Sequence, residues 1–312
     1  MTEAGDSIMG TKKRMLFIIN PRSGRERIRR KLLEILDLFS AEGYHIQVHV
    51  TQAAKDAKNT ASKEGAKYDL IVCSGGDGTL NETISGIMEI EEKRRPQIGY
   101  IPGGSTNDFA ASLKLPKQVL QAAQTAACGT AVPIDIGRFC DDRYFVYVAG
   151  FGAFTEVSYM TPQDRKNVLG HQAYMIESVK SLASIKSYPM KVTWEDGTLE
   201  GEFIFGMVTN TTSVGGFKGL INQNVALDDG LFEVLLIRTP KTPLELSAIV
   251  SELFLTDEAD SELVYKFRTS SIQVESEEEV DWVLDGEFGG SRTKVEIKNL
   301  PRCLNIRKNM DV

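Results

Sequence analysis

Hydrophobic and polar residues follow one rhythm up to about residue 134 and another beyond it. In the first part, apolar runs of strand length at Met15–Ile19, Leu70–Cys73 and Ile98–Ile101 are followed by polar turns and then by apolar residues at helical spacing. Strands that alternate with helices favour a mostly parallel sheet covered on both faces. The pattern therefore predicts an α/β domain over residues 1–134.

The second part of the chain is typical of a series of strands with few helices. Helical spacing is confined to about 165–185 and 243–254, and strands are predicted at 144–149, 190–194, 203–208, 232–237, 272–274 and 294–297. Many strands with few helices indicate a mainly antiparallel β-sandwich or a barrel, and we expect this domain over residues 135–299. We interpret the acidic run Glu275–Asp281 as a solvated turn or strand edge.

The composition agrees with two globular domains, and the distribution of charge is its most informative feature. The chain has 312 residues, 42% hydrophobic and 25% charged, which is ordinary globular usage. Residues 1–134 carry 18 basic and 15 acidic side chains, and the rest carry 18 and 28, giving a net charge of −7. A negative total argues against nucleic-acid binding. The basic groups Lys12–Arg14, Arg22–Lys31 and Lys93–Arg95 are either solvated faces or local attractions for phosphates or an anionic membrane.

Cysteine spacing and the absence of long apolar runs set expectations about location. No run approaches the roughly 18 apolar residues that span a bilayer, and the start of the chain is too polar for a signal-peptide core. The four cysteines have no metal-binding or disulfide spacing, so we expect reduced core thiols in a cytoplasmic protein.

Several familiar catalytic motifs are missing. There is no P-loop and no protein-kinase H-R-D loop, and Gly76-Asp77-Gly78 has Asn81 where a dinucleotide-binding turn needs a third glycine. With only three histidines in the chain, a zinc site or a histidine-based triad is not expected.

The segment Gly75–Thr79 carries the strongest chemical signal, because it joins a strand to a helix. Its glycines let the backbone approach a polyanion, and the amides at the following helix N-terminus favour negative charge. Asp77 conflicts with a phosphate unless Mg²⁺ lies between them, since that ion takes oxygen ligands from both. The alternative is a tight turn in which Asp77 only caps the helix.

Two further turns repeat this arrangement. Asn20–Gly24 follows the strand at Met15–Ile19, and Pro102–Ala110 follows the strand at Ile98–Ile101 with two glycines, two hydroxyls and the carboxylate of Asp108. Each alone is also explained by turn formation or helix capping. Three such turns at three strand ends together favour one phosphate-binding rim, because ligands of parallel sheets lie beyond the carboxyl ends of the strands.

Together, the three turns resemble the catalytic domain of the diacylglycerol kinase and lipid kinase family, and are most similar to the soluble bacterial diacylglycerol kinases. Asp135 matches the acidic position at the family's domain junction, and Leu227–Gly230 and Leu284–Glu287 match its two late motifs. The resemblance covers nearly the whole chain. It implies a Rossmann-like, NAD kinase-like first domain that binds nucleotide, to which residues 300–312 return, and a β-sandwich second domain that binds lipid.

The resemblance also implies roles for individual residues. Glu287 is expected to be the general base, with Asp77, Asp108, Asp135 and Asp285 as further catalytic residues; the first three of these would hold catalytic Mg²⁺ through water. A second, structural metal would be held by the Asp229 side chain and the carbonyls of Ala226 and Leu231. The ATP contacts implied are Asn20, Pro21, Arg22, Ser23, Gly24, Thr51, Gly75, Gly76, Asp77, Gly78, Thr79, Leu80, Asn81, Ser105 and Thr106.

The sequence therefore predicts an ATP-dependent kinase that makes phosphatidic acid from diacylglycerol. A kinase for another acceptor, such as a sphingoid base, an isoprenoid alcohol or NAD, stays open, as does a non-enzymatic protein that binds nucleotide or lipid. We expect peripheral contact with an anionic membrane through a basic patch and an apolar rim, with Arg27, Arg30, Lys31 and Lys93–Arg95 as candidates for the patch. A homodimer is an expectation from the family alone.

Overall fold

The chain forms two compact units in a computed structural model. Unit 1 comprises residues 1–105, 114–132 and 305–312, and unit 2 comprises residues 106–113 and 133–304. The predicted helix at about 165–185 lies outside the described residues. The structure describes residues 13–23, 27–104, 106–140, 143–152, 186–211, 213–214, 217–218, 225–255 and 262–309.

Unit 1 is built on parallel strands. Strand β1 pairs in parallel with β2 and β3, and β3 pairs in parallel with β4. The last part of strand β15 adds a further parallel neighbour, because Ile306 pairs with Ile98 of β4. The order is therefore β15-β4-β3-β1-β2, which leaves β2 at an edge. The strands are β1 (Lys13–Ile19), β2 (Tyr44–Val50), β3 (Leu70–Gly75), β4 (Gln97–Pro102) and β15 (Glu287–Lys308).

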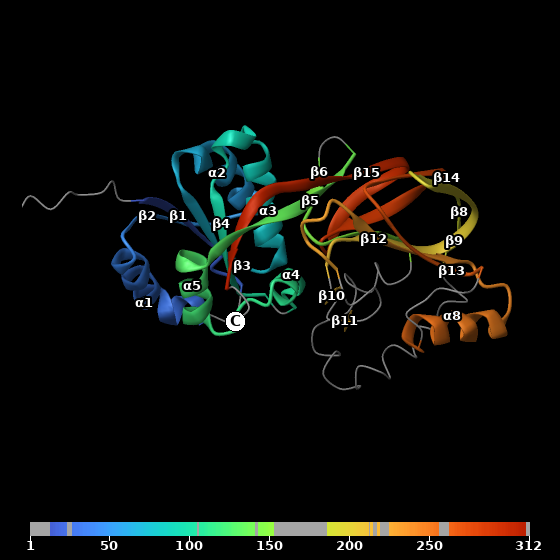
Figure 1. The fold of residues 1–312 in the computed structure, drawn as a ribbon, viewed down its shortest axis with the longest axis horizontal. Coiled ribbons are helices and arrows are strands. Elements are labelled where there is room, and N and C mark those ends of the chain that lie inside the picture. Colours follow the sequence, from blue (N-terminus) through green and yellow to red (C-terminus); the bar gives the residue numbers. More distant parts are fainter. Residues whose placement is uncertain are drawn as a thin grey trace, which may run out of the picture. The chain divides into compact units, whose positions relative to one another are not determined.

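Helices cover both faces of this sheet (Figure 1). Side chains alternate between the faces of a strand, so Met15, Phe17 and Ile19 of β1 all point to one side, where they pack with α1 and α5. Helices α2 and α3 pack against each other on the other side. The helices and helical turns are α1 (Arg27–Ala41), α2 (Asp56–Glu64), η2 (Gly65–Lys67), α3 (Asp77–Met88), η3 (Glu92–Arg94) and α5 (Val119–Cys128).

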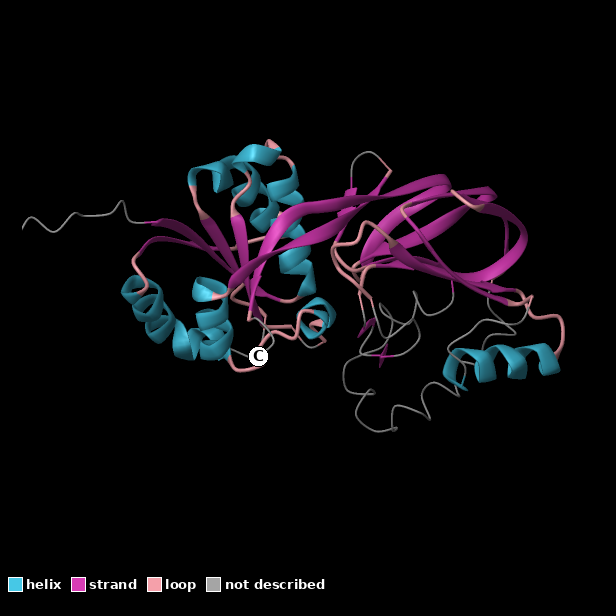
Figure 2. Ribbon diagram, viewed as in Figure 1, coloured by secondary structure: helices cyan, strands magenta, loops and turns pink. Residues whose placement is uncertain are grey.

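Unit 2 consists mainly of antiparallel strands (Figure 2). Its strand order is β13-β12-β9-β7-β14-β15, with β8 paired to β14 and β9, and β5 paired to β15 and β6. Its elements are α4 (Asp108–Ser112), β5 (Thr130–Phe139), β6 (Arg143–Phe145), β7 (Val148–Gly152), β8 (Tyr188–Trp194), β9 (Gly197–Thr209), β10 (Ser213–Val214), β11 (Phe217–Lys218), β12 (Phe232–Arg238), α8 (Pro243–Leu255), β13 (Val264–Thr269) and β14 (Ser271–Leu284).

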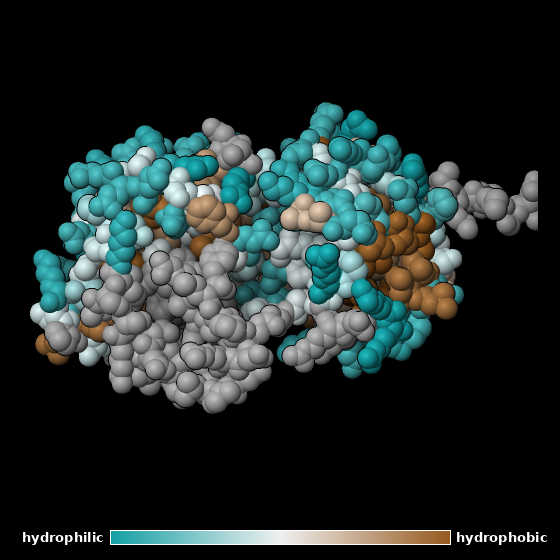
Figure 3. Space-filling model, turned by 180° about the vertical axis from the view of Figure 1, so that it is seen from behind, coloured by the Kyte–Doolittle hydropathy of each residue, from teal (hydrophilic) through white to brown (hydrophobic). Residues whose placement is uncertain are grey.

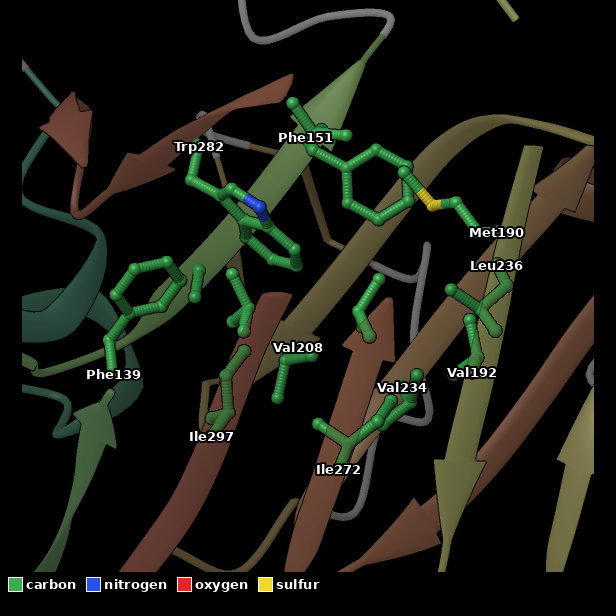
Figure 4. Packing of buried hydrophobic residues seen from close by; sticks show 14 of the residues in the cluster. Phe139, Phe151, Met190, Val192, Val208, Val234, Leu236, Ile272, Trp282 and Ile297 are labelled. Carbon is green, nitrogen blue, oxygen red and sulfur yellow. The ribbon is translucent and has the colours of Figure 1, made fainter. Parts of the chain in front are cut away.

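The core of unit 2 combines aromatic and aliphatic side chains, part of which Figure 4 shows. Trp282 packs against Phe139 and Phe151, with ring centroids 5.3 and 5.0 Å apart. Val234, Leu236 and their neighbours fill the rest, and this buried cluster holds strands β12, β14 and β15 together. Such a rigid framework is what fixes the turns at the strand ends.

Two expectations need correction. The acidic run Glu275–Asp281 is mostly exposed, as expected, but it is not a turn: it lies in the middle of β14, where the pairing with β15 shifts register between Glu275 and Val280. The irregularity explains why a solvated run fits within a strand, because a bulge turns side chains outward. Cys73 is a core thiol as expected, but Cys128 is exposed. None of the helices in the described ranges is long and apolar enough to cross a membrane.

Candidate active site

The turn between β3 and α3 is shaped by the lack of a side chain at Gly75. A Cβ there would lie 2.3 Å from the Thr79 Oγ1, so the strand passes into the helix only with glycine at this place. Helix α3 begins at Asp77, which is half-buried, and Gly76 precedes it in extended conformation. The first amides of a helix have no carbonyl partners within the helix and carry partial positive charge, so this end can bind an anion.

The first turn is attached directly to this one. The backbone N–H of Asn20 donates to the Ser74 carbonyl at 2.9 Å, and the Asn20 side-chain amide donates to the Thr79 hydroxyl at 3.0 Å. Within the turn, Arg22 N–H donates to Asn20 Oδ1 and the Ser23 hydroxyl donates to the Asn20 carbonyl. Asn20 therefore fixes the relative position of two predicted phosphate-binding segments.

The third turn closes against both of the others. The N–H of Gly103 donates to the Gly75 carbonyl at 2.7 Å, and a Cβ on Gly103 would lie 3.2 Å from the Ser23 Oγ. A Cβ on Gly76 would lie 3.3 Å from the Cα of Gly104. The three glycine-rich turns thus meet at one edge of the sheet. Of the predicted contacts in these turns, Gly24 and Ser105 lie outside the described residues.

The remaining predicted nucleotide contacts lie at different places in the fold, and not all of them belong to unit 1. Thr51 follows β2, where its N–H donates to the Ile19 carbonyl at 2.9 Å, so it belongs to the same edge. Leu80 stabilises the turn between β3 and α3, because its side chain is buried in the core and its N–H donates to the Gly76 carbonyl. Asn81 is half-buried on α3. Thr106 is exposed and belongs to unit 2.

A buried tyrosine that the sequence patterns did not single out supports the glycine turn. The Tyr100 hydroxyl donates to the Gly75 carbonyl at 3.2 Å, which is also the acceptor of the Gly103 amide. Burial, followed by the negative charge of Asp77, raises the pKa of Tyr100 well above its usual value. The phenol therefore stays a hydrogen-bond donor. Its place in an apolar strand gave no hint of this role.

In unit 2, the acidic residues of the late motifs hold backbone. Asp285 is buried, and its carboxylate accepts the N–H groups of Val146, Tyr147 and Val148 at 2.6 to 3.0 Å. This cage holds Asp285 and Gly286 at φ of 49° and 85°, the left-handed turn that joins β14 to β15. The next residue, Glu287, is exposed. Asp285 is thereby placed to position the turn that presents Glu287.

Asp135 is fully buried and holds two segments from other parts of the chain. Its carboxylate accepts the N–H of Gly230 and the N–H of Arg302, both at 2.7 Å. Burial raises the pKa of Asp135, and the two backbone hydrogen bonds oppose that shift. Since the Asp135 N–H also donates to the Leu227 carbonyl, the two family-like motifs at 135 and 227–230 form one structure.

Asp229 lies in the same turn and contacts Arg268. The Arg268 guanidinium donates to Asp229 Oδ2, and the Leu231 N–H donates to Asp229 Oδ1 at 3.1 Å. The buried Glu233 lies 3.3 Å from Arg268 Nε, and burial raises the pKa of Glu233 to about 7 although Arg268 opposes the shift. Arg268 and Glu233 have no sequence signal, since they come together only through the pairing of β12 with β13.

Asp108 is the first residue of the short helix α4 and is buried in unit 2. Asn107 precedes it in the left-handed conformation, with a φ of 53°. The Ser112 hydroxyl at the other end of α4 is hydrogen-bonded to the Thr211 hydroxyl. The predicted third motif is therefore divided, because its glycines belong to unit 1 and its carboxylate belongs to unit 2.

Comparison with known proteins assigns the chain to a family. Residues 14–139 match the diacylglycerol kinase catalytic domain, and residues 148–308 match the YegS C-terminal NAD kinase beta sandwich-like domain. The diacylglycerol kinase of Bacillus subtilis strain 168 is 37% identical over 299 residues, which covers 94% of this chain and 96% of the relative. The chain belongs to the diacylglycerol kinase family. It is thus a lipid kinase, with the glycine-rich turns in the catalytic-domain match.

Other relatives agree over the full length. The diacylglycerol kinase of Staphylococcus epidermidis strain ATCC 12228 is 32% identical over 302 residues, covering 96% of this chain and 94% of the relative. A crystal structure of a candidate diacylglycerol kinase from Bacillus anthracis strain Sterne has a TM-score of 0.80 and 26% identity, covering 96% of this chain and 98% of that one. The similarity to these relatives therefore extends over both domains of this kinase.

Proposed function

We propose that this kinase transfers the γ-phosphate of ATP to the hydroxyl of diacylglycerol, giving phosphatidic acid and ADP. The observation that carries the proposal is the meeting of three glycine-rich turns at one edge of the unit 1 sheet, next to the N-terminus of α3. Backbone amides and glycines packed this closely suit a polyphosphate. The relatives named diacylglycerol kinase supply the choice of acceptor.

The residues of unit 1 suit both ATP and Mg²⁺. Asn20–Ser23, Thr51 and Gly75–Asn81 would bind the nucleotide, with the first amides of α3 directed at its phosphates. The Asp77 carboxylate at the first residue of α3 is the oxygen ligand type that Mg²⁺ prefers. When bound, Mg²⁺ neutralises charge on the phosphates. For Asp108 and Asp135 we propose a role toward Mg²⁺ through water and not as direct ligands; both Asp135 oxygens already accept backbone N–H groups.

Glu287 is proposed as the general base. Its carboxylate would take the proton of the acceptor hydroxyl while that oxygen forms a bond to the γ-phosphorus, and the bond from phosphorus to the β,γ-bridging oxygen breaks to release ADP. The turn supports this role. Asp285 and Gly286 are held in left-handed conformations by three backbone hydrogen bonds, and Glu287 follows them with an exposed side chain.

The acceptor is tested by supplying the purified kinase with ATP labelled at the γ-position, Mg²⁺ and one acceptor at a time. Diacylglycerol, sphingosine and an isoprenoid alcohol are presented in mixed micelles, NAD is presented in solution, and products are separated by chromatography. We expect label in phosphatidic acid at a rate at least tenfold above any other product. Faster labelling of another acceptor overturns the diacylglycerol assignment, and no labelling at all, with ATP binding retained, favours a binding protein.

We also propose that unit 1 contacts an anionic membrane through helix α1 and strand β2. Leu33 of α1 is 81% exposed, and Arg29, Arg30 and Lys31 beside it are exposed as well. Exposed apolar residues continue on the edge strand β2, at Val48 and Val50. Hydrophobic surface gathers over this part of unit 1 (Figure 3). An apolar rim with cations beside it suits the surface of a bilayer that contains anionic lipid.

Vesicle sedimentation tests this contact. The matched variants are Leu33→Glu and Leu244→Glu, because both leucines are 81% exposed but Leu244 lies on α8 of unit 2. We expect binding to phosphatidylglycerol vesicles at low salt to be lost with Leu33→Glu and retained with Leu244→Glu. Equal binding by all three proteins contradicts the proposed surface. The expected cytoplasmic location and the homodimer stay predictions, the second to be checked by light scattering.

A further inference from the structure

The turn that the family resemblance assigns to a structural metal is already in contact with a positively charged side chain. Arg268 on β13 lies directly opposite Glu233 on β12 in the strand pairing. Its guanidinium reaches past Glu233 to the Asp229 carboxylate in the turn that precedes β12. One arginine therefore joins two carboxylates of the region, one buried and one at the surface.

The residues of this turn do not fit a divalent ion as well as they fit Arg268. Asp229 would be the only side-chain ligand, and its two oxygens are taken by the guanidinium and by the Leu231 N–H. A divalent ion on the same carboxylate would lie in contact with a group that stays positively charged at any ordinary pH. The two cations would repel each other, and only the carbonyls of Ala226 and Leu231 would remain as ligands.

Arg268 also supplies a positive partner for the buried carboxylate of Glu233, which a metal at Asp229 would not do. Glu233 is 3% exposed, and its Oε2 is buried without a hydrogen-bond partner among the described residues. A buried carboxylate that has no positive partner is strongly destabilising. The fork of a guanidinium can serve two carboxylates at once, which an isolated ion held by carbonyls at the turn does not do.

We propose that in this kinase the guanidinium of Arg268 takes the place of the structural metal. It ties the turn Asp228–Leu231 to the paired strands β12 and β13. The same turn gives its Gly230 N–H to Asp135, so Arg268 positions the backbone that holds Asp135 in place. The inference uses the family membership and does not depend on which lipid is phosphorylated.

Thermal unfolding of the full-length chain without nucleotide tests the proposal, in EDTA and in millimolar MgCl₂ or CaCl₂. Arg268→Gln removes the guanidinium, and Lys294→Gln is the matched control, because Lys294 pairs with Glu275 across β14 and β15, away from the turn. We expect the same Tm for the wild-type chain under all conditions. We expect Arg268→Gln to lower the Tm by several degrees, and divalent ions to restore part of that loss through the vacated carboxylates.

Three further variants, which are Arg268→Gln with Asp229→Asn, Arg268→Lys and Asp229→Asn alone, make each outcome support or contradict the proposal. Adding Asp229→Asn to Arg268→Gln should remove the rescue by metal, and Arg268→Lys should retain independence from EDTA. A wild-type Tm that falls in EDTA, with Asp229→Asn abolishing the response, overturns the proposal, as does an Arg268→Gln variant with unchanged Tm. If Arg268→Gln does not fold, calorimetric titration of the wild-type chain with Mg²⁺ decides, because binding that Asp229→Asn removes contradicts the proposal.

Discussion

The two units use similar sequence motifs in opposite ways. In unit 1, glycine-rich turns bring three backbone segments into contact, and Asp77 is the first residue of helix α3. In unit 2, the carboxylates of Asp285, in an Asp-Gly turn, and of Asp135, within strand β5, are buried and accept backbone N–H groups. We therefore propose ligand binding for Asp77 of unit 1, whereas Asp135 and Asp285 of unit 2 hold backbone in place.

The difference follows from what surrounds each carboxylate. A buried carboxylate needs two or three donors, and in unit 2 the backbone supplies them. Such a group already has its hydrogen-bond partners and holds its neighbours in place. Glu287 is exposed two residues beyond Asp285, which supports the proposal that Glu287 transfers the proton while Asp285 holds the turn.

The largest effect is expected at Glu287. Replacement by glutamine keeps the size of the side chain and removes the base, so we expect kcat to fall by about 10²–10⁴-fold with KM for ATP unchanged. Glu279→Gln is the matched control, since it also removes an exposed acid from the same hairpin. Steady-state kinetics with diacylglycerol measure both. Activity near wild type in Glu287→Gln would mean that the base lies elsewhere.

Variants of Asp285 test whether its carboxylate only holds the backbone in place or also takes part in catalysis. Asp285→Ala leaves three buried N–H groups without their acceptor, and we expect the free energy of unfolding to fall by on the order of 3 kcal/mol. Asp285→Asn keeps one acceptor oxygen and should lose less. Urea denaturation and kcat are measured together. A large loss of kcat in Asp285→Asn with unchanged stability would show that the carboxylate itself takes part in the reaction.

Much of unit 1 could be predicted from sequence because its signals are local. The glycine turns are contiguous in the chain, and each follows an apolar strand, so the run Gly75–Thr79 already indicates a close backbone approach. What local pattern could not give is Asn20 reaching Thr79, or Tyr100 holding Gly75. These contacts join segments far apart in the sequence, and only the order of strands in the sheet brings them together.

The late motifs were harder to interpret, because their partners are distant. Asp285 binds amides more than 130 residues earlier in the chain, and Asp229 meets Arg268 through strand pairing alone. No spacing rule connects these positions. The family resemblance indicated which residues matter, but not that Asp285 would clamp backbone or that Arg268 would hold Asp229.

A smaller effect is expected at the glycine turn of unit 1. A Cβ on Gly75 would lie 2.3 to 2.7 Å from three side-chain atoms of Thr79, which must then move. We expect Gly75→Ala to cost about 1–3 kcal/mol of stability and to raise KM for ATP several-fold. Gly76→Ala meets only Gly104, at 3.3 Å or more, and should change both less. The reverse order of effects would contradict the geometry of the turn.

The smallest effect concerns the link between the first two turns. Asn20 and Thr79 share one side-chain hydrogen bond of 3.0 Å, so a double-mutant cycle of Asn20→Ala and Thr79→Val isolates it. We expect a coupling of about 0.5–1.5 kcal/mol in the free energy of unfolding. If the link pre-organises the phosphate site, the same cycle measured on ATP affinity shows coupling of the same sign. Coupling in stability but none in affinity would mean that this hydrogen bond serves folding alone. Asn20 and Thr79 would then stabilise the backbone of unit 1, as Asp135 and Asp285 do in unit 2.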